Sequence, residues 1–428
     1  MVEDIAAPIK NALVGGPFGS NLVSRDYVSL GVPVIRGQNM SSRWVEGDFA
    51  FVSEKKAAQL SPNTARPGDL IFTQRGTLGQ VAIVPQQPFD HYIVSQSQMK
   101  LTVDSQQTDA LFLYYFFSSE EQQDYVRRNA VQTGVPHTNL EHLRRTPLLL
   151  PPLPEQRAIA AILGALDDKI ELNRTMNQRL EQMAQALFKS WFVDFDPVHA
   201  NRNGEAMPGL AREVQALFPS AFEDSALGEI PQGWQIEPLD RIAHFLNGLA
   251  LQKFPAIDDY LPVIKIAELR KGVTESSGKA SPNIEAKYIV DDGDILFSWS
   301  GSLEVVVWCG GRGALNQHLF KVTSAQYPRW FYYLWTKEHL PEFQSIAAGK
   351  ATTMGHIQRH HLTAATTRVP PPHVLKSMTN IIEPLLMHIV NNNIASRTLA
   401  ATRDALLPKL LSGEVRVREV EKMIEEIM

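Results

Sequence analysis

The chain has 428 residues, of which 44% are hydrophobic and 20% are charged, and its formal net charge is −5. This length predicts roughly two to four domains with apolar cores, and the composition argues against wholesale disorder. The single cysteine, Cys309, excludes an intramolecular disulfide, and no apolar run is long enough to span a bilayer. The start lacks a basic segment followed by an apolar run, so we expect a soluble cytoplasmic protein.

The first 150 residues have the pattern of a mixed α/β module. Short β-type runs such as VPVIRG, DLIFTQ, VAIVP and QMKLTV are separated by Gly, Pro and Asn. The aromatic run FLYYFF predicts a helix that begins after a cap at Thr108 or Asp109. Because this run is apolar on nearly every face, we expect it in the core rather than stacked on bases.

A long helix is predicted from Glu155 to Trp191. Its apolar stripe recurs at alternating steps of four and three residues, which is a heptad seam, at Leu166, Ile170, Asn173, Asn177, Leu180, Ala184, Leu187 and Trp191. Residues 194–227 are rich in Pro, Gly and Ala and are expected to connect this helix to a second module.

The rest of the chain repeats this organisation. ARPGDLIFTQRGTLGQVAIV returns as VDDGDILFSWSGSLEVVVWC, displaced by 225 residues, and ALDDKIELNRTMNQRL returns as PLLMHIVNNNIASRTL, displaced by 219. The displacement varies in the first part of each copy and is constant from the paired prolines onward. Insertions collect in loops, whereas an inserted residue would rotate everything that follows it in a helix. We therefore predict a duplication of a loop-rich module followed by a long helix.

Two long seams in one chain can pair with each other in antiparallel orientation. An Asn shared by both seams would then fix their register at some cost in stability. The alternative is that each helix packs only on its own module. For the paired arrangement, the predicted helix–helix interface consists of Leu166, Ile170, Asn173, Leu180, Leu187, Leu385, Ile389, Asn392, Leu399 and Leu406.

No catalytic constellation is evident. The chain lacks a P-loop, a Gly-x-Gly-x-x-Gly turn and the tetrapeptide of amino-methylating enzymes, and the histidines of HIQRHH lack a carboxylate partner. We predict no catalytic residue, no metal and no cofactor, which favours recognition or scaffolding. From Phe343 to Ile382 there is no Asp or Glu, and this local basic field suits phosphate binding despite the net charge.

The chain resembles the specificity subunit of type I restriction–modification enzymes over essentially its whole length. The resemblance rests on GPFGS, GVPVIRGQNM, GDLIFTQRGTLG, the PLPEQ helix ending in KSWFVDF, and the linker DFDPV to SALGEIPQGW. PPPHV in place of PLPEQ, and Pro408 in the second helix, make the second repeat less typical. The abrupt start is compatible with a first module that lacks an initial strand.

The resemblance implies an α+β fold with two mixed α/β target recognition domains joined by two long antiparallel coiled-coil helices in a pseudo-twofold tandem repeat. The expected boundaries are 1–150 for the first recognition domain, 151–193 for the first spacer helix, 194–227 for the connector, 228–369 for the second recognition domain, and 370–428 for the second helix and tail.

By the same resemblance, the chain is a non-catalytic subunit in phage defence whose two domains each read half of a bipartite, asymmetric site in double-stranded DNA. The helices would set the spacing and dock two copies of an adenine-methylating modification subunit, and translocating restriction subunits would join the complex. Alternatives are a coiled-coil scaffold that binds only proteins, or a nucleic-acid enzyme that acts alone.

The candidate DNA-contacting residues are polar side chains in predicted loops, because Arg, Lys, Asn and Gln match guanine and adenine edges. Arg75 and Ser300 occupy equivalent turns of the two copies. The set is Arg36, Gln38, Asn39, Arg75, Gln96, Gln98, His137, Thr138 and Asn139 in the first module, and Lys253, Lys265, Ser300, Gln317, His318, Lys350, Thr352, Thr353 and His356 in the second.

Overall fold

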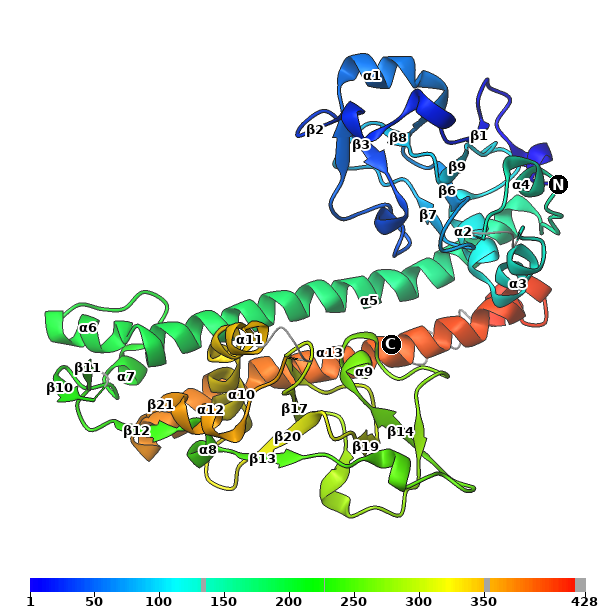
Figure 1. The fold of residues 1–428 in the computed structure, drawn as a ribbon. Coiled ribbons are helices and arrows are strands. Elements are labelled where there is room, and N and C mark those ends of the chain that lie inside the picture. Colours follow the sequence, from blue (N-terminus) through cyan, green and yellow to red (C-terminus); the bar gives the residue numbers. More distant parts are fainter. Residues whose placement is uncertain (132–135, 227, 350–354, 420–428) are drawn as a thin grey trace. The chain divides into compact units, whose positions relative to one another are not determined.

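The computed structural model describes residues 1–131, 136–226, 228–349 and 355–419 (Figure 1). Contacts divide the chain into two units, Met1–Asp168 together with Ala400–Met428, and Lys169–Leu399. We call them unit 1 and unit 2. Within the described ranges, no helix combines the length and the apolar character that crossing a membrane requires.

Two sheets build the module of unit 1. The antiparallel sheet has the order β1 (Leu13–Gly15), β9 (Gln98–Leu101), β6 (Leu70–Thr73) and β7 (Val81–Ile83). The mixed sheet has the order β2 (Tyr27–Val28), β4 (Ala50–Val52), β3 (Val32–Ile35), β8 (Tyr92–Val94) and β5 (Thr64–Ala65), with β3 and β8 parallel. Every residue of β3, β6, β8 and β9 is buried, and the sequences of the parallel pair β3 and β8 are accordingly apolar throughout.

The helices of this module are α1 (Glu54–Gln59), α2 (Ala110–Ser118), α3 (Glu120–Arg128) and α4 (Leu140–Arg144). Helix α2 contains the aromatic run, and the Asp109 side chain caps it by accepting a hydrogen bond from the backbone of Phe112. Phe112, Leu113 and Tyr115 are buried in one core with residues of both long helices. The predicted cap and the core location of this run are thus confirmed.

Unit 2 contains sheets with corresponding strand orders. The antiparallel sheet has the order β13 (His244–Asn247), β20 (Leu319–Thr323), β17 (Ile295–Ser298) and β18 (Val305–Val307). The mixed sheet has the order β15 (Lys279–Ala280), β14 (Leu261–Ile264), β19 (Gly313–Leu315) and β16 (Ile289–Val290), with β14 and β19 parallel. Two further pairs are β10 (Phe222–Ser225) with β11 (Gly228–Pro231), and β12 (Gln235–Pro238) with β21 (Thr366–Val369).

The shorter helices of unit 2 are α6 (Asp196–Asn203), α7 (Arg212–Gln215), α8 (Leu239–Ile242), α9 (Ile266–Lys271), α10 (Arg329–Glu338), α11 (Leu340–Ala348) and α12 (Arg359–Ala364). Helix α10 carries the second aromatic run, and Trp330, Phe331 and Trp335 are fully buried in the largest core. The expected connector belongs to this core as well, because Val198 and Phe218 pack there.

Two long helices complete the fold. Helix α5 spans Leu153–Phe188 and continues as a π-helical turn, η6 (Lys189–Val193), and α13 spans Pro372–Ser412 (Figure 1). Pro408 therefore lies inside a helix. Single 3₁₀ turns occur at η1 (Val2–Ile5), η2 (Gly19–Asn21), η3 (Ser24–Asp26), η4 (Gly37–Asn39), η5 (Ser61–Asn63), η7 (Leu251–Lys253) and η8 (Ala286–Tyr288).

Within unit 2, the two long helices are joined by an amide network. The Asn173 side chain donates to Ser396 Oγ at 3.1 Å, and the Asn177 side chain donates to Asn393 Oδ1 at 2.8 Å. Asn392 donates to Asn177 Oδ1 at 2.9 Å. The partner numbers on α13 fall as the α5 numbers rise, so these segments are antiparallel. Asn173 is only 2% exposed, so its amide is satisfied by the opposite helix rather than by water.

Within unit 1, the start of α5 and the end of α13 also meet. Leu410 packs in the core that contains Ile159 and Leu163, and Arg403 forms an ion pair with Asp167. Among the predicted interface positions, Leu166 and Ile389 are buried, whereas Ile170, Leu180, Leu187, Leu385, Asn392, Leu399 and Leu406 are half-buried.

Candidate nucleic-acid interface

In unit 1, three loop segments meet where β6 and β8 end. Backbone hydrogen bonds run from Gln74 N to Ser97 O at 2.7 Å and from Thr138 N to Gln74 O at 3.0 Å. Arg75 and His137 form an isolated antiparallel bridge. We call residues 74–76, 95–98 and 136–139 the first edge. It brings together six of the nine candidates predicted in this module, namely Arg75, Gln96, Gln98, His137, Thr138 and Asn139.

Unit 2 has the same arrangement where β17 and β19 end. Trp299 N donates to His318 O at 3.3 Å, and Ile357 N donates to Trp299 O at 3.0 Å. Ser300 and His356 form the isolated antiparallel bridge. We call residues 299–301, 316–318 and 355–357 the second edge. Four candidates lie there, namely Ser300, Gln317, His318 and His356.

The two edges differ in their side chains. Arg75 and Gln96 are exposed on the first edge, whereas Ser300 on the second edge is 3% exposed. The Ser300 hydroxyl lies 2.9 Å from His318 Nδ1. Beside it, the Trp299 indole donates to Asn247 Oδ1 at 2.9 Å, and its ring centroid lies 6.0 Å from that of His318. One edge therefore presents long hydrogen-bonding side chains, and the other presents rings fixed by their neighbours.

A hollow adjoins each edge, of about 480 Å³ at the first edge and about 430 Å³ at the second. The first is lined by Gly76, Leu78, Arg127, Ala130 and Pro136. The second is lined by Arg270, Gly301, Ser302, Leu303, Glu304, Gln344, Ala347, Ala348 and Gly355. Arg127 pairs with Asp124 in the first unit, and Arg270 pairs with Glu304 in the second, so each hollow has a guanidinium at its border.

In unit 1, several of the predicted DNA-contacting residues form hydrogen bonds that stabilise the fold. Asn39 is fully buried and donates to Glu46 O and Asp48 O, both at 3.0 Å. Gln38 also donates to Asp48 O, and Asn139 caps α4 through a hydrogen bond from His142 N. Gln98 is 1% exposed and accepts a hydrogen bond from the Ser95 hydroxyl. These four side chains are buried or already hydrogen-bonded within the protein. Arg75 and Gln96 are therefore the candidates most accessible to a ligand.

The remaining candidates are not among the residues of the two edges, or they lie outside the described residues. Arg36 and Lys265 directly follow Ile35 and Ile264, whose backbone oxygens accept hydrogen bonds from Ser95 N and Asn316 N of the edges at 3.0 and 3.2 Å. Arg36 is half-buried and precedes η4. Lys253 and Lys265 are exposed, the first in η7 and the second just before α9. Lys350, Thr352 and Thr353 fall outside the described residues.

The acid-free segment contributes to the surroundings of the second edge. Arg359 at the start of α12 donates to Phe245 O at 3.3 Å, and its guanidinium lies 5.6 Å from the centroid of the Phe320 ring. The part of the chain that the structure describes contains no group of three or more His, Cys, Asp or Glu residues placed to hold a metal ion.

Sequence reasoning missed Trp299, the most prominent ring of the second edge. Trp299 lies 225 residues after Gln74, the same displacement that relates Ser300 to Arg75. The signal for Trp299 is therefore present in a position-by-position alignment of the two similar segments, where it directly precedes Ser300.

Comparison with known proteins identifies a family. Residues 25–182 match the family described as "Type I restriction modification DNA specificity domain". The chain is 25% identical over 382 residues to the type I restriction enzyme MjaIX specificity subunit of Methanocaldococcus jannaschii, covering 86% of this chain and 82% of that protein. It is 24% identical over 400 residues to the HindI specificity subunit of Haemophilus influenzae, covering 82% and 87%.

A solved structure shares the fold. The type I restriction–modification S subunit from M. genitalium aligns with a TM-score of 0.54 at 15% sequence identity, covering 96% of this chain and 94% of that one. At this identity the likeness concerns the fold alone.

Proposed function

Because the chain belongs to the family of type I restriction–modification specificity subunits, we propose that its two modules each read one half of a bipartite, asymmetric DNA site. The observation that carries this proposal is the pair of edges. They share one backbone hydrogen-bond pattern and differ in the side chains placed on it. Equivalent surfaces with different donors and rings suit two half-sites of different sequence.

The long helices support a role as spacer. A displacement of 219 residues carries Asn173 to Asn392 and Asn177 to Ser396. The bond from Asn173 to Ser396 thus has its counterpart in the bond from Asn392 to Asn177. This reciprocity is what a pseudo-twofold axis between two antiparallel helices produces. A buried amide network also opposes a slip of register, because a slip would leave several amides unsatisfied.

In this proposal the helices hold the two readers a fixed distance apart on duplex DNA, whose grooves repeat roughly every 34 Å. The partners would be double-stranded DNA, two adenine-methylating modification subunits docked on the helices, and restriction subunits that join the complex. This chain contributes recognition and geometry, and the bond-making steps belong to its partners.

Methylome sequencing tests the proposal directly. Cells with and without this gene, each with an intact modification subunit, should differ by one gapped, asymmetric adenine-methylation motif. Purified alone, the chain should neither cleave DNA nor transfer methyl groups. Unchanged methylation in the deletion strain would contradict the proposal and favour a scaffold that binds only proteins.

A domain exchange sharpens the test. Replacing residues 228–369 with the second recognition domain of a relative should change one half of the motif and leave the other half and the gap unchanged. A change in both halves would show that the modules do not read DNA separately.

A further inference from the structure

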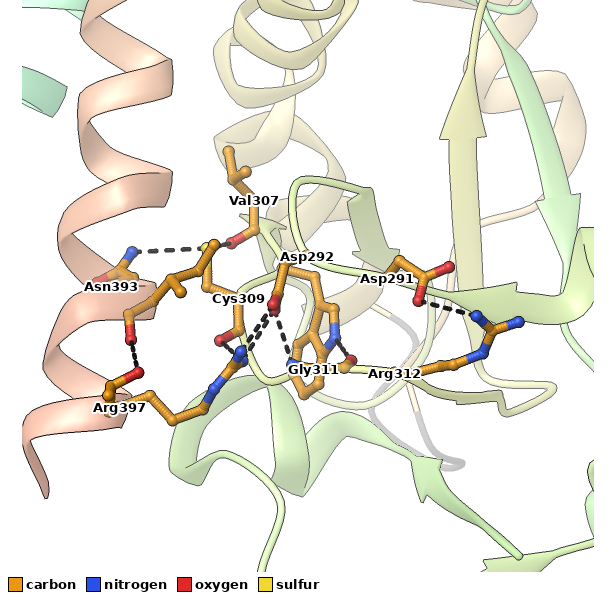
Figure 2. Close-up of polar contacts among 11 residues, drawn as sticks. Asp291, Asp292, Val307, Cys309, Gly311, Arg312, Asn393 and Arg397 are labelled. Carbon is orange, nitrogen blue, oxygen red and sulfur yellow. Dashed lines mark hydrogen bonds and ion pairs between the residues drawn. The ribbon is translucent and has the colours of Figure 1, made fainter. Parts of the chain in front are cut away.

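Two turns of the second module are bonded to α13 by one arginine (Figure 2). Arg397 of α13 donates to both carboxylate oxygens of Asp292, at 2.9 and 2.7 Å, and also to the backbone oxygen of Cys309. Asp292 accepts a further bond from Gly311 N at 2.8 Å. The turn of residues 291–294 and the loop of residues 308–312 therefore share one carboxylate and one guanidinium.

The ion pair between Arg397 and Asp292 has a defined orientation, because both carboxylate oxygens accept hydrogen bonds from the guanidinium. A guanidinium that donates twice to one carboxylate fixes the plane and distance of the pair, which a point charge cannot do. The bidentate bond from Arg397 lowers the pKa of Asp292 below its ordinary value, so the carboxylate is charged at neutral pH. Gly311 adopts a φ of +85°, a conformation in which a side chain is strained, and its position lies against the Arg397 guanidinium.

A second arginine ties the same turn to α13 at another point. Arg329 of α10 donates to Gly293 O at 3.1 Å and to Glu383 Oε1 of α13 at 2.6 Å. Glu383 and Arg397 are 14 residues apart on α13, which is about 21 Å at 1.5 Å per residue. Two attachments separated along a rigid helix oppose rotation of the module about either one.

The attached turns lead directly into the strands that carry the second edge. β17 begins at Ile295, right after the turn, and ends one residue before Trp299. β19 begins at Gly313, right after the loop, and ends one residue before Asn316. Each strand is three or four residues long and buried, so a displacement at its start is transmitted to its end without a flexible joint.

We propose that Asp292 and Arg397 are positioning residues that set where the second edge stands relative to α13, and thereby the gap between the two DNA half-sites. The inference rests on the proposed function, and it concerns spacing rather than the identity of any base. Neither residue touches DNA in this scheme.

The adjacent residue Asp291 provides a matched control. Its carboxylate is exposed and lies 3.9 Å from Arg312, another exposed side chain, without a bond to α13 among the described contacts (Figure 2). Asp291→Asn and Asp292→Asn therefore make the same chemical change one residue apart. Arg397→Gln and Arg397→Lys test the other partner, and the lysine retains the charge but cannot bind bidentately.

The experiment uses the complete methyltransferase complex and three DNA duplexes whose half-sites are separated by the native gap or by one base pair more or less. We measure binding and methylation on each, together with thermal unfolding of each variant. For Asp292→Asn and Arg397→Gln, the preference for the native gap should fall by about tenfold, since small misplacements of reacting parts have effects of this size or larger. Binding to a duplex that holds only the second half-site should remain near wild type.

The control Asp291→Asn should keep the full preference, and Arg397→Lys should be intermediate. The inference is overturned when Asp292→Asn keeps the native preference, or when Asp291→Asn loses it equally. It is also overturned when the two variants lose affinity for the isolated half-site as strongly as they lose gap preference, because the contact would then maintain the module's fold.

The same measurements distinguish failure of the proposed function from failure of the inference about Asp292 and Arg397. A wild-type complex that does not distinguish the three duplexes, or that recognises no half-site, rejects the bipartite reader itself. Wild-type discrimination combined with unaltered variants rejects only the role of Asp292 and Arg397.

Discussion

The first and second edges have equivalent backbone hydrogen bonds but carry different side chains. On the first edge, Arg75 and Gln96 are exposed on two neighbouring segments, which are joined by the backbone hydrogen bond from Gln74 N to Ser97 O. On the second edge Trp299 occupies the place of Gln74, and the Ser300 hydroxyl is turned to His318. Because backbone hydrogen bonds do not depend on side-chain identity, the same backbone arrangement can be kept while the exposed side chains change.

Under the proposed function, the residues that stabilise each module differ from those that recognise DNA. The shared parts are buried strands and an aromatic helix, and the divergent parts are side chains at the ends of those strands. We therefore expect core substitutions to act alike in the two units, and edge substitutions to act on one half-site only.

The largest expected effect comes from the shared cores. Trp330 of α10 and Phe112 of α2 are 0% and 1% exposed, and truncating either to alanine should lower the free energy of unfolding of its unit by about 3–5 kcal/mol. Chemical unfolding monitored by circular dichroism measures this change. Phe18→Ala is the control, since that ring is 78% exposed, and its unfolding midpoint should match wild type. A small effect at Trp330 or Phe112 would contradict the shared-core interpretation.

The next effect concerns the first edge. Arg75→Ala should weaken binding of the assembled complex to one half-site by about 10- to 100-fold, as expected for the loss of a bidentate base contact. Subunit assembly and unfolding should not change, because Arg75 is exposed. Filter binding with single base-pair substitutions in each half-site checks this. Arg128→Ala, on the outer face of α3, serves as the control. Unaltered affinity in Arg75→Ala would remove this side chain from the interface.

The aromatic helices and the two long helices could be predicted from the sequence, because their patterns depend on local periodicity. The displacement of 219 residues identified Asn392 as the counterpart of Asn173, and the structure places both in one amide network. The cap at Asp109 was equally predictable, because a side chain that caps a helix acts over three residues.

Other features depend on contacts between residues distant in sequence. Asn39 has the residue type of a base reader, but its burial under the loop of residues 46–48 follows only from the folded chain. The link from Arg397 to Asp292 joins residues 105 positions apart and has no counterpart pattern in the first copy. In unit 1, Arg43 pairs with Asp168 of α5 and donates to Gly164 O. The internal sequence similarity therefore predicts the packing that the two units share but not these ion pairs, which differ between them.

A smaller effect is expected in the helix pair. Asn173→Ala should lower the free energy of unfolding by about 1–2 kcal/mol, because it removes donors to Asn392 O and Ser396 Oγ and leaves both acceptors without this partner. Leu172→Ala, on the exposed face one residue earlier, should change stability much less. Urea unfolding of both variants gives the comparison. Equal effects at the two positions would mean that the amide network contributes nothing specific.

The smallest expected effect lies at the second edge and tests whether its rings are held in place. Ser300→Ala removes the hydroxyl that lies 2.9 Å from His318 Nδ1, and the free energy of unfolding should fall by about 0.5–1.5 kcal/mol. Affinity for the second half-site should fall less than Arg75→Ala lowers affinity for the first, since Ser300 is buried and its hydroxyl faces His318. Binding to duplexes altered in each half-site separates these outcomes. A loss as large as that of Arg75→Ala, without loss of stability, would show that Ser300 itself contacts DNA.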